Sequence, residues 1–160
     1  MIIRALKSRE SDFLADMLYE AIFIPEGHPP FPREIVKELS LSKYIEKWGK
    51  DKFDIALVVE IENKLVGAVW GRLFTNENKG FGYIDNKTPE LSMAIKNEYR
   101  NQGIGTKLIE AIITEYNKIE VKFLSLSVDK ANKSLNLYKR IGFETVEEKE
   151  TSLTMRKRIS

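Results

Sequence analysis

The segment Leu91–Thr106, LSMAIKNEYRNQGIGT, constrains the fold of this chain more than any other. A short apolar run leads into a polar loop with Gly103 and Gly105, and a helical pattern follows. Glycine permits positive φ angles and close approach of a ligand to the backbone, and the free N–H groups of a first helical turn attract anions. The segment therefore predicts a strand, a phosphate-binding loop and the start of a helix.

Two common nucleotide-binding motifs do not fit this loop. A dinucleotide-binding motif requires a third glycine where Leu108 stands, and a Walker-type phosphate loop requires a glycine where Arg100 stands. Taken alone, the two glycines could do no more than shape a turn into the helix. The rest of the chain has to distinguish a binding loop from a structural turn.

The elements expected on either side of this segment indicate one α/β domain over residues 1–160. Hydrophobic periodicity predicts strands over residues 2–6, 54–61, 65–74, 91–96, 121–128, 143–147 and 152–156. It predicts helices over residues 8–22, 35–48, 104–116 and 132–140, of which the second could be broken near Ser40. The helix that connects strands 91–96 and 121–128 predicts a crossover between parallel strands. The order predicts an α/β (α+β) fold with a mixed sheet and helices on both faces.

Composition excludes several kinds of chemistry. The chain has no cysteine and one histidine, His28, so disulfides, thiolate metal sites and cysteine nucleophiles are excluded, and we expect no metal. The 26 Lys and Arg residues and 24 Asp and Glu residues are scattered, which argues against a nucleic-acid partner. No apolar run approaches the roughly 20 residues that span a bilayer, and no signal peptide is recognisable, so we expect a soluble, cytoplasmic protein with no membrane partner.

Two segments resemble the signatures of a known family. Residues Ile95–Gly105 are similar to the acetyl-CoA signature of the GNAT (Gcn5-related) N-acetyltransferases, Arg/Gln-x-x-Gly-x-Gly/Ala. Residues Asn132–Phe143 resemble the family's second signature, an Asn, then Leu-Tyr, then Gly-Phe. The two occur in the family's order, and the predicted elements match the family fold along essentially the whole chain. One departure is Asn97, where the family commonly has a proline.

This resemblance implies the acyl-CoA N-acyltransferase fold. Its sheet would have six to seven strands, mostly antiparallel, with a central, splayed pair of parallel strands and the pantetheine arm of acetyl-CoA between them. The resemblance implies that backbone groups of Met93 and Ile95 pair with that arm, and that amides from about Asn101 to Thr106 hold the pyrophosphate. The expected cofactor-binding residues are Met93, Ala94, Ile95, Arg100, Asn101, Gln102, Gly103, Ile104, Gly105, Thr106 and Asn132.

The resemblance also implies the transfer of an acetyl group to a primary amine. That reaction requires a neutral amine, a stabilised oxyanion and a proton for the leaving thiolate, and direct transfer in a ternary complex needs no protein nucleophile. Tyr138 is the expected general acid, although a tyrosine at this helical spacing more often packs in a core. Glu90 is the expected general base, with Asp85 or Tyr83 assisting. Asn132 could equally cap a helix, a role compatible with cofactor binding.

The acceptor side is less specified by the signatures. The first two helical segments and the loops over residues 25–32 and 75–89 would line it, and Glu26, Asp85 and Glu90 could attract a cationic amine of a small molecule or a peptide. A homodimer through the C-terminal strands or through exposed aromatic residues is compatible with the sequence. The alternatives are a non-catalytic acyl-CoA-binding or sensing module of the same fold, and a nucleotide-binding regulatory domain.

Overall fold

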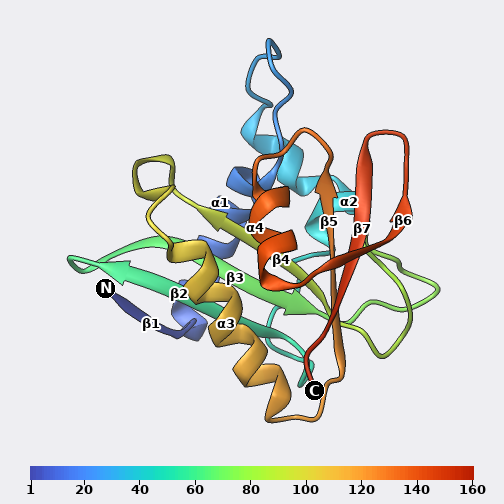
Figure 1. Cartoon of the computed structure of the whole chain (residues 1–160). Coiled ribbons are helices and arrows are strands. Elements are labelled where there is room, and N and C mark those ends of the chain that lie inside the picture. Colours follow the sequence, from blue (N-terminus) through green and yellow to red (C-terminus); the bar gives the residue numbers. More distant parts are fainter.

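The computed structural model describes all 160 residues, which form a seven-stranded sheet with helices on both faces (Figure 1). The strands are β1 Ile2–Ala5, β2 Ile55–Ile61, β3 Lys64–Arg72, β4 Glu90–Ile95, β5 Phe123–Asp129, β6 Glu144–Glu148 and β7 Ser152–Arg158. The α-helices are α1 Asp12–Ala21, α2 Leu39–Ser42, α3 Ile104–Asn117 and α4 Ser134–Ile141, and 3-10 helices occupy η1 Ser8–Glu10, η2 Arg33–Lys37 and η3 Asn97–Tyr99. None of the helices combines the length and the apolar character needed to cross a membrane.

The sheet has the strand order β1-β2-β3-β4-β5-β7-β6. Every neighbouring pair is antiparallel except β4 and β5. The turn between β2 and β3 places Glu62 and Asn63 at φ angles of 51° and 66°, as a tight two-residue hairpin requires. The topology confirms the predicted mixed, mostly antiparallel sheet with one parallel pair.

The parallel pair is joined at one position only. Glu90 is paired with Ser125, and the Ser125 N–H donates to the carbonyl of Pro89 at 3.0 Å. Beyond this point toward their C-terminal ends the two strands no longer pair, so they separate as the resemblance implied. We call the space between β4 and β5 beyond Glu90 and Ser125 the strand gap.

Alternation along the strands divides the core into two layers. On one face, Val69 and Leu124 pack with Leu108 and Ile112 of α3, and α4 covers the same side (Figure 1). On the other face, Trp70 packs with residues of α1, and α2 lies on that side. The predicted arrangement of helices on both faces is confirmed.

The predicted helical segment over residues 35–48 is not one continuous helix: it is interrupted at Glu38, close to the break near Ser40 that the sequence left open. Only Leu39–Ser42 is α-helical, and the extended conformation of Glu38, with a ψ of 139°, separates η2 from α2. Two carbonyls that a longer helix would use internally accept hydrogen bonds from β3 instead: Arg72 donates to Lys43 at 2.8 Å, and Trp70 donates to Tyr44 at 3.2 Å. The apolar residues of this segment therefore reach the sheet through successive turns.

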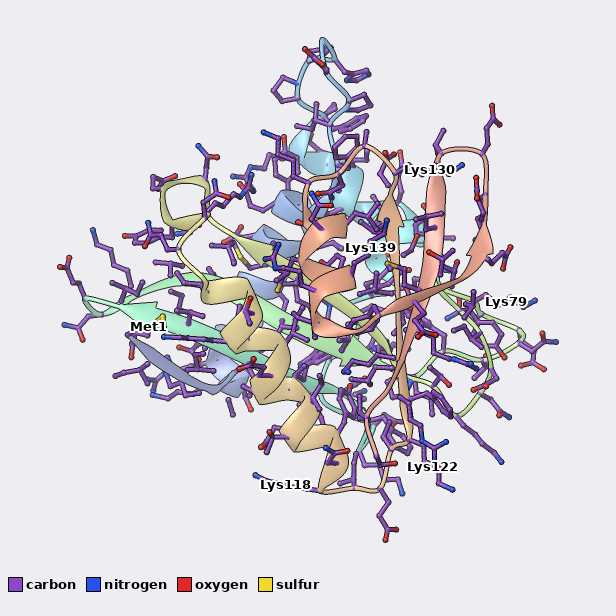
Figure 2. The ribbon with its side chains drawn as sticks, in the orientation of Figure 1. Met1, Lys79, Lys118, Lys122, Lys130 and Lys139 are labelled. Carbon is purple, nitrogen blue, oxygen red and sulfur yellow. The ribbon has the colours of Figure 1, made fainter.

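Charged side chains are spread over the molecule (Figure 2). The labelled Lys79, Lys118, Lys122 and Lys130 lie at separate places around its outline. A protein that grips a nucleic-acid backbone usually gathers such groups on one face. The positions of these lysines agree with the scattered charge of the sequence.

Candidate active site

The first turn of α3 presents backbone N–H groups that have no helical partner. Gly103 precedes the helix with a φ of 80°, and no side chain caps it. The first N–H that bonds back is that of Lys107, which donates to the Gly103 carbonyl at 3.4 Å. The N–H groups of residues 104–106 are therefore free, and the helix dipole adds partial positive charge at the same place. Phosphate groups commonly bind at helix N-termini of this kind.

The backbone of β4 is turned toward the strand gap at alternate residues. The N–H of Lys96 donates to the carbonyl of Val66 on β3 at 2.8 Å. Because backbone groups alternate in an antiparallel ladder, those of Met93 and Ile95 are then directed away from β3. At this level β5 no longer pairs with β4, so these groups have no strand partner. They are the groups that an extended ligand in the strand gap would bond.

Ala94 does not share this orientation. It is paired with Ala68 on β3, and its side chain is buried in the core layer of α1. Neither its backbone nor its side chain is turned to the strand gap. Of the three β4 residues expected to bind the cofactor, the structure thus brings only Met93 and Ile95 to that place.

The other expected residues of the loop are exposed around the start of α3. Arg100 donates through Nε to the carbonyl of Ile95 at 2.8 Å, and its guanidinium lies 3.6 Å from the carboxylate of Glu20 on α1. Asn101 has a φ of 62°, so two left-handed residues, Asn101 and Gly103, shape the loop. Gln102 makes only a long contact of 3.4 Å with the carbonyl of residue 98. Their free polar groups surround the open helix end.

Three elements converge at Gly105. A Cβ atom at this position would lie 3.0 Å from Leu137 on α4 and 3.2 Å from Met93 on β4. The glycine therefore lets the start of α3 approach α4 and the strand gap closely. Figure 1 shows α4 over the part of the sheet where β4 and β5 separate.

Tyr138 lies on α4, beside Leu137. Its side chain is 9% exposed and stands edge-on to Phe143, with ring centroids 6.1 Å apart. Burial raises the pKa of the Tyr138 hydroxyl to about 12, so the group keeps its proton at neutral pH. The core position is the one that helical spacing predicts, and the protonated hydroxyl is the form that a general acid requires.

Asn132 lies two residues before the start of α4 and bonds to its first N–H group, while Lys133 holds the N-cap position itself. The Asn132 Oδ1 accepts a hydrogen bond from the N–H of Ser134 at 2.9 Å. This bond resembles the capping role that the sequence left open beside cofactor binding. The side-chain NH₂ group is not used by that bond and can still donate to a ligand.

Glu90 lies at the closed end of the strand gap, where β4 and β5 still pair. Its side chain is 4% exposed; Oε2 accepts a hydrogen bond from the Tyr44 hydroxyl at 2.5 Å, and Oε1 has no hydrogen-bond partner. Burial raises the pKa of Glu90 to about 7, against the opposing effects of the Tyr44 hydrogen bond, the nearby Gly82 N–H and two lysines. The Gly82 N–H favours the charged form without meeting the geometry of a full hydrogen bond to Oε1.

A pKa near 7 has a chemical consequence for Glu90. A carboxyl with an ordinary pKa is a weak base at neutral pH, whereas one that titrates near 7 can take up and release a proton there. Such perturbed groups gather at functional sites, although buried structural carboxyls are perturbed as well. The burial of Glu90 therefore lets its carboxyl exchange a proton near neutral pH.

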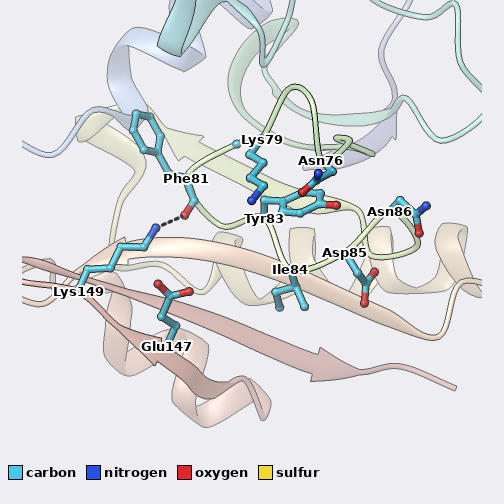
Figure 3. Close-up of a pocket in the computed structure, with 10 residues that line it drawn as sticks. Asn76, Lys79, Phe81, Tyr83, Ile84, Asp85, Asn86, Glu147 and Lys149 are labelled. Atoms are coloured by element: carbon cyan, nitrogen blue, oxygen red, sulfur yellow. Dashed lines mark hydrogen bonds between the residues drawn. The ribbon is translucent and has the colours of Figure 1, made fainter.

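The loop between β3 and β4 covers Glu90. A Cβ atom on Gly80 would overlap Oε1 of Glu90, so this position of the loop requires a glycine. Lys149 fastens the loop from the β6–β7 turn by donating to the carbonyl of Phe81 at 2.9 Å (Figure 3). Tyr44 fastens it from the other side, because the Phe81 N–H donates to the Tyr44 hydroxyl at 2.7 Å.

A polar cavity of about 540 Å³ lies on the outer side of this loop (Figure 3). Tyr83 and Asp85, the two residues expected to assist Glu90, line this cavity, and Glu147 and Lys149 face them from the C-terminal hairpin. Gly80 lines the cavity, and a Cβ atom on it would overlap Oε1, so Gly80 is next to both the cavity and the Glu90 carboxyl. Asp85 is exposed and its Oδ1 accepts the N–H of Lys87 at 2.9 Å.

The sequence did not identify Tyr44, Gly80 or Lys149 as parts of the site. Tyr44 falls within the predicted helical segment 35–48, and Lys149 falls between the last two predicted strands. Nothing in a single sequence links position 44 or 149 to position 90. These contacts arise only when the loop is folded over the sheet.

Comparisons with known proteins agree with the fold. Residues 16–143 match the model of the Acetyltransferase (GNAT) family. An N-alpha-acetyltransferase of Sulfurisphaera tokodaii is 33% identical over 96 residues, which cover 56% of this chain and 56% of that protein. The chain thus spans little more than half the length of this relative.

Solved structures share the fold over nearly the whole chain. The GNAT domain of S. lividans PAT has a TM-score of 0.71 at 14% identity, covering 98% of this chain and 89% of that one. The PaiA N-acetyltransferase of Thermoplasma acidophilum, in complex with coenzyme A, has a TM-score of 0.70 at 19% identity, covering 98% of each. The Escherichia coli ribosomal-protein-S18-alanine N-acetyltransferase has a TM-score of 0.68 at 16% identity, covering 99% and 94%. At these identities the likeness shows the fold alone.

Proposed function

This chain belongs to the Acetyltransferase (GNAT) family, and we propose that it transfers the acetyl group of acetyl-CoA to a primary amine, directly within a ternary complex. One observation carries the proposal: the strand gap has backbone groups without a strand partner and an open helix end on one side, and the buried Glu90 carboxyl at its closed end. The first feature suits an extended phosphate-bearing substrate. The second suits removal of a proton from an amine.

The groups at the strand gap fit acetyl-CoA by their chemistry. The backbone of Met93 and Ile95 can pair with the amides of a pantetheine arm, as a strand partner would. The free N–H groups of residues 104–106 can bind a pyrophosphate. Acetyl-CoA supplies the activated thioester, and we propose no role for a metal ion.

Two residues then handle the protons. Glu90, through Oε1, takes a proton from the ammonium group of the acceptor, directly or through a water molecule, so that a neutral amine can attack the thioester carbon. The C–N bond forms, the C–S bond breaks, and Tyr138 donates its proton to the departing sulfur. The amine nitrogen loses its second proton to solvent, and Tyr138 and Glu90 return to their starting states by exchange with solvent. One proton is released overall.

We propose the α-amine of a peptide as the first acceptor to test. The Sulfurisphaera relative is named an N-alpha-acetyltransferase, and the Escherichia coli structural neighbour is a ribosomal-protein-S18-alanine N-acetyltransferase. The carboxylates of Asp85 and Glu147 in the cavity beside Glu90 would attract a cationic amine of either a peptide or a small molecule.

The test is an acetylation assay in which released thiol is measured with a panel of peptides, polyamines and aminoglycosides. We expect acetyl-CoA to bind in calorimetry and at least one amine to release thiol above the rate of hydrolysis. Binding without release by any amine would favour the alternative, a non-catalytic acyl-CoA-binding module. A folded protein that does not bind acetyl-CoA would refute both.

The assembly state is a separate proposal. Strand β6 forms one edge of the sheet and is exposed along its whole length, so a homodimer through the C-terminal strands stays a prediction. Light scattering at several protein concentrations would test it. A mass that stays monomeric would contradict it without affecting the proposed reaction.

A further inference from the structure

A chain of polar groups runs from the covering loop to Glu90. The Phe81 N–H donates to the Tyr44 hydroxyl, which donates to Oε2 of Glu90. An amide N–H can only donate, so it occupies an acceptor position of the hydroxyl and leaves the hydroxyl proton directed at the carboxylate. The direction of this series of hydrogen bonds is therefore fixed by the Phe81 N–H, which can only donate.

Tyr44 is held firmly in this position. Its side chain is 5% exposed, and its ring packs edge-on against Phe74 at 4.9 Å and stacks with Phe81 at 6.3 Å between centroids. Burial and the charge of Glu90 raise the pKa of Tyr44 well above its usual value. Tyr44 thus stays protonated when Glu90 is charged, and it serves as a donor and not as a base.

The two oxygens of Glu90 differ in their surroundings. Oε2 is held by Tyr44, whereas Oε1 is buried without a partner and faces Gly80. A buried carboxylate oxygen without a hydrogen bond is costly, and that cost falls when a proton binds to it.

We propose that Tyr44 is a positioning residue for Glu90: its hydroxyl fixes Oε2 and leaves Oε1 as the atom that accepts the proton. The proposal rests on the proposed function, because it assigns the atoms of that reaction's general base. It adds a residue from a segment that neither family signature contains.

The charged groups around Glu90 act less directly. Lys43 donates to the carbonyl of residue 79 and Lys149 to that of residue 81, so both reach the loop and not the carboxylate. Arg72 lies on β3, where it is paired with Glu90, and its guanidinium forms a salt bridge with Asp54 at 3.0 Å. Among these groups Tyr44 makes the one direct side-chain hydrogen bond to Glu90, and it therefore opposes the effect of burial most specifically.

The test is the titration of Glu90 in Tyr44→Phe, followed by carbon-13 NMR of the side-chain carboxyl, which Glu90→Gln assigns. Removing the donor destabilises the charged form, so we expect the midpoint to rise by about one pH unit. The apparent pKa of the acid limb of the kcat/KM profile should rise by the same amount, and the affinity for acetyl-CoA should not change. An unchanged midpoint would overturn the proposal.

Tyr116→Phe is the matched control. Tyr116 is also buried, and its hydroxyl donates to the carbonyl of Phe53 at 2.7 Å in the other core layer. It loses a tyrosine hydrogen bond without touching Glu90 or the covering loop, so the Glu90 midpoint in this variant should equal that of the wild type. An equal shift in both variants would mean a general loss of packing and would overturn the role of Tyr44.

A second measurement needs no substitution at Tyr44. In the wild-type protein the Cζ resonance of Tyr44 should titrate with the midpoint of Glu90, and a resonance that does not respond would overturn the hydrogen bond itself. Neither titration requires a substrate. If the Glu90 and Tyr44 resonances titrate together but the protein turns over no amine, the proposed function alone is refuted. If the protein turns over an amine but the Glu90 midpoint is unchanged in Tyr44→Phe, the role of Tyr44 alone is refuted.

Discussion

The two halves of the candidate site are built differently. The cofactor half consists largely of main-chain groups from one continuous segment, residues 93–106. The acid–base half consists of side chains from segments far apart, with Tyr44 and Lys149 brought to the loop that covers Glu90. Main-chain groups need only the right local conformation, whereas a side-chain cluster needs the whole fold. Changes in the first half should alter binding, and changes in the second should alter rate and pH dependence.

The largest effect that would separate the two halves is expected for Glu90→Gln. Loss of the general base should lower kcat/KM at neutral pH by about 100- to 1,000-fold, with acetyl-CoA affinity in calorimetry unchanged. Glu110→Gln, an exposed change on α3, is the control and should retain full activity. Joint loss of rate and acetyl-CoA affinity in Glu90→Gln would show that the halves are not independent.

The pH dependence of stability sharpens the same contrast. Because the pKa of Glu90 is raised from 4.5 to about 7, the folded protein binds this proton more tightly than the unfolded chain. The stabilisation that this tighter proton binding gives the folded protein is complete below pH 4.5 and declines as the pH rises to about 7. Above that pH it is lost, and the stability no longer changes through this group. Relative to Glu90→Gln, the wild type should lose up to about 3 kcal/mol of unfolding free energy over that range. Parallel curves in denaturant titrations would contradict this.

A smaller effect is expected for Tyr138→Phe. Removing the proton donor for the departing thiolate should lower kcat by about 30-fold, while acetyl-CoA affinity stays the same. Burial is the sole cause of the raised pKa of Tyr138, so the hydroxyl has no strong internal partner and its removal should leave the fold intact. An unchanged kcat in steady-state kinetics would remove Tyr138 from the mechanism.

The smallest of these effects is expected for Gly103→Val, in the main-chain half. A β-branched residue is strained at a φ of 80°, so the loop should shift and the Kd for acetyl-CoA should rise by about tenfold. Gly49→Val is the control, because Gly49 has a φ of 93° and equally open surroundings but lies outside the site. If both variants lose acetyl-CoA affinity equally, backbone strain alone explains the effect and Gly103 has no special place in the binding loop.

Local patterns account for most of the correct predictions. The apolar stripe after Gly105 predicted α3, and alternation predicted the central strands, because both depend on which residues along one segment face the core. The prediction of a helical segment over residues 35–48 was right only in part: it allowed a break near Ser40, but beyond Ser42 the chain forms turns whose carbonyls accept hydrogen bonds from Arg72 and Trp70. Ala94, which was expected at the cofactor, is turned away from the strand gap by its pairing with β3.

The sequence by itself determined the family, the crossover between parallel strands and the open end of α3. Each of these depends on glycines and apolar residues at short, fixed spacings, which act through local backbone conformation. The tertiary structure decided the electrostatic state of Glu90. Its burial, its bond to Tyr44 and the cover over Oε1 come from segments that meet only in the folded sheet. The desolvation that raises a pKa depends on everything packed around the group, and no local pattern records it.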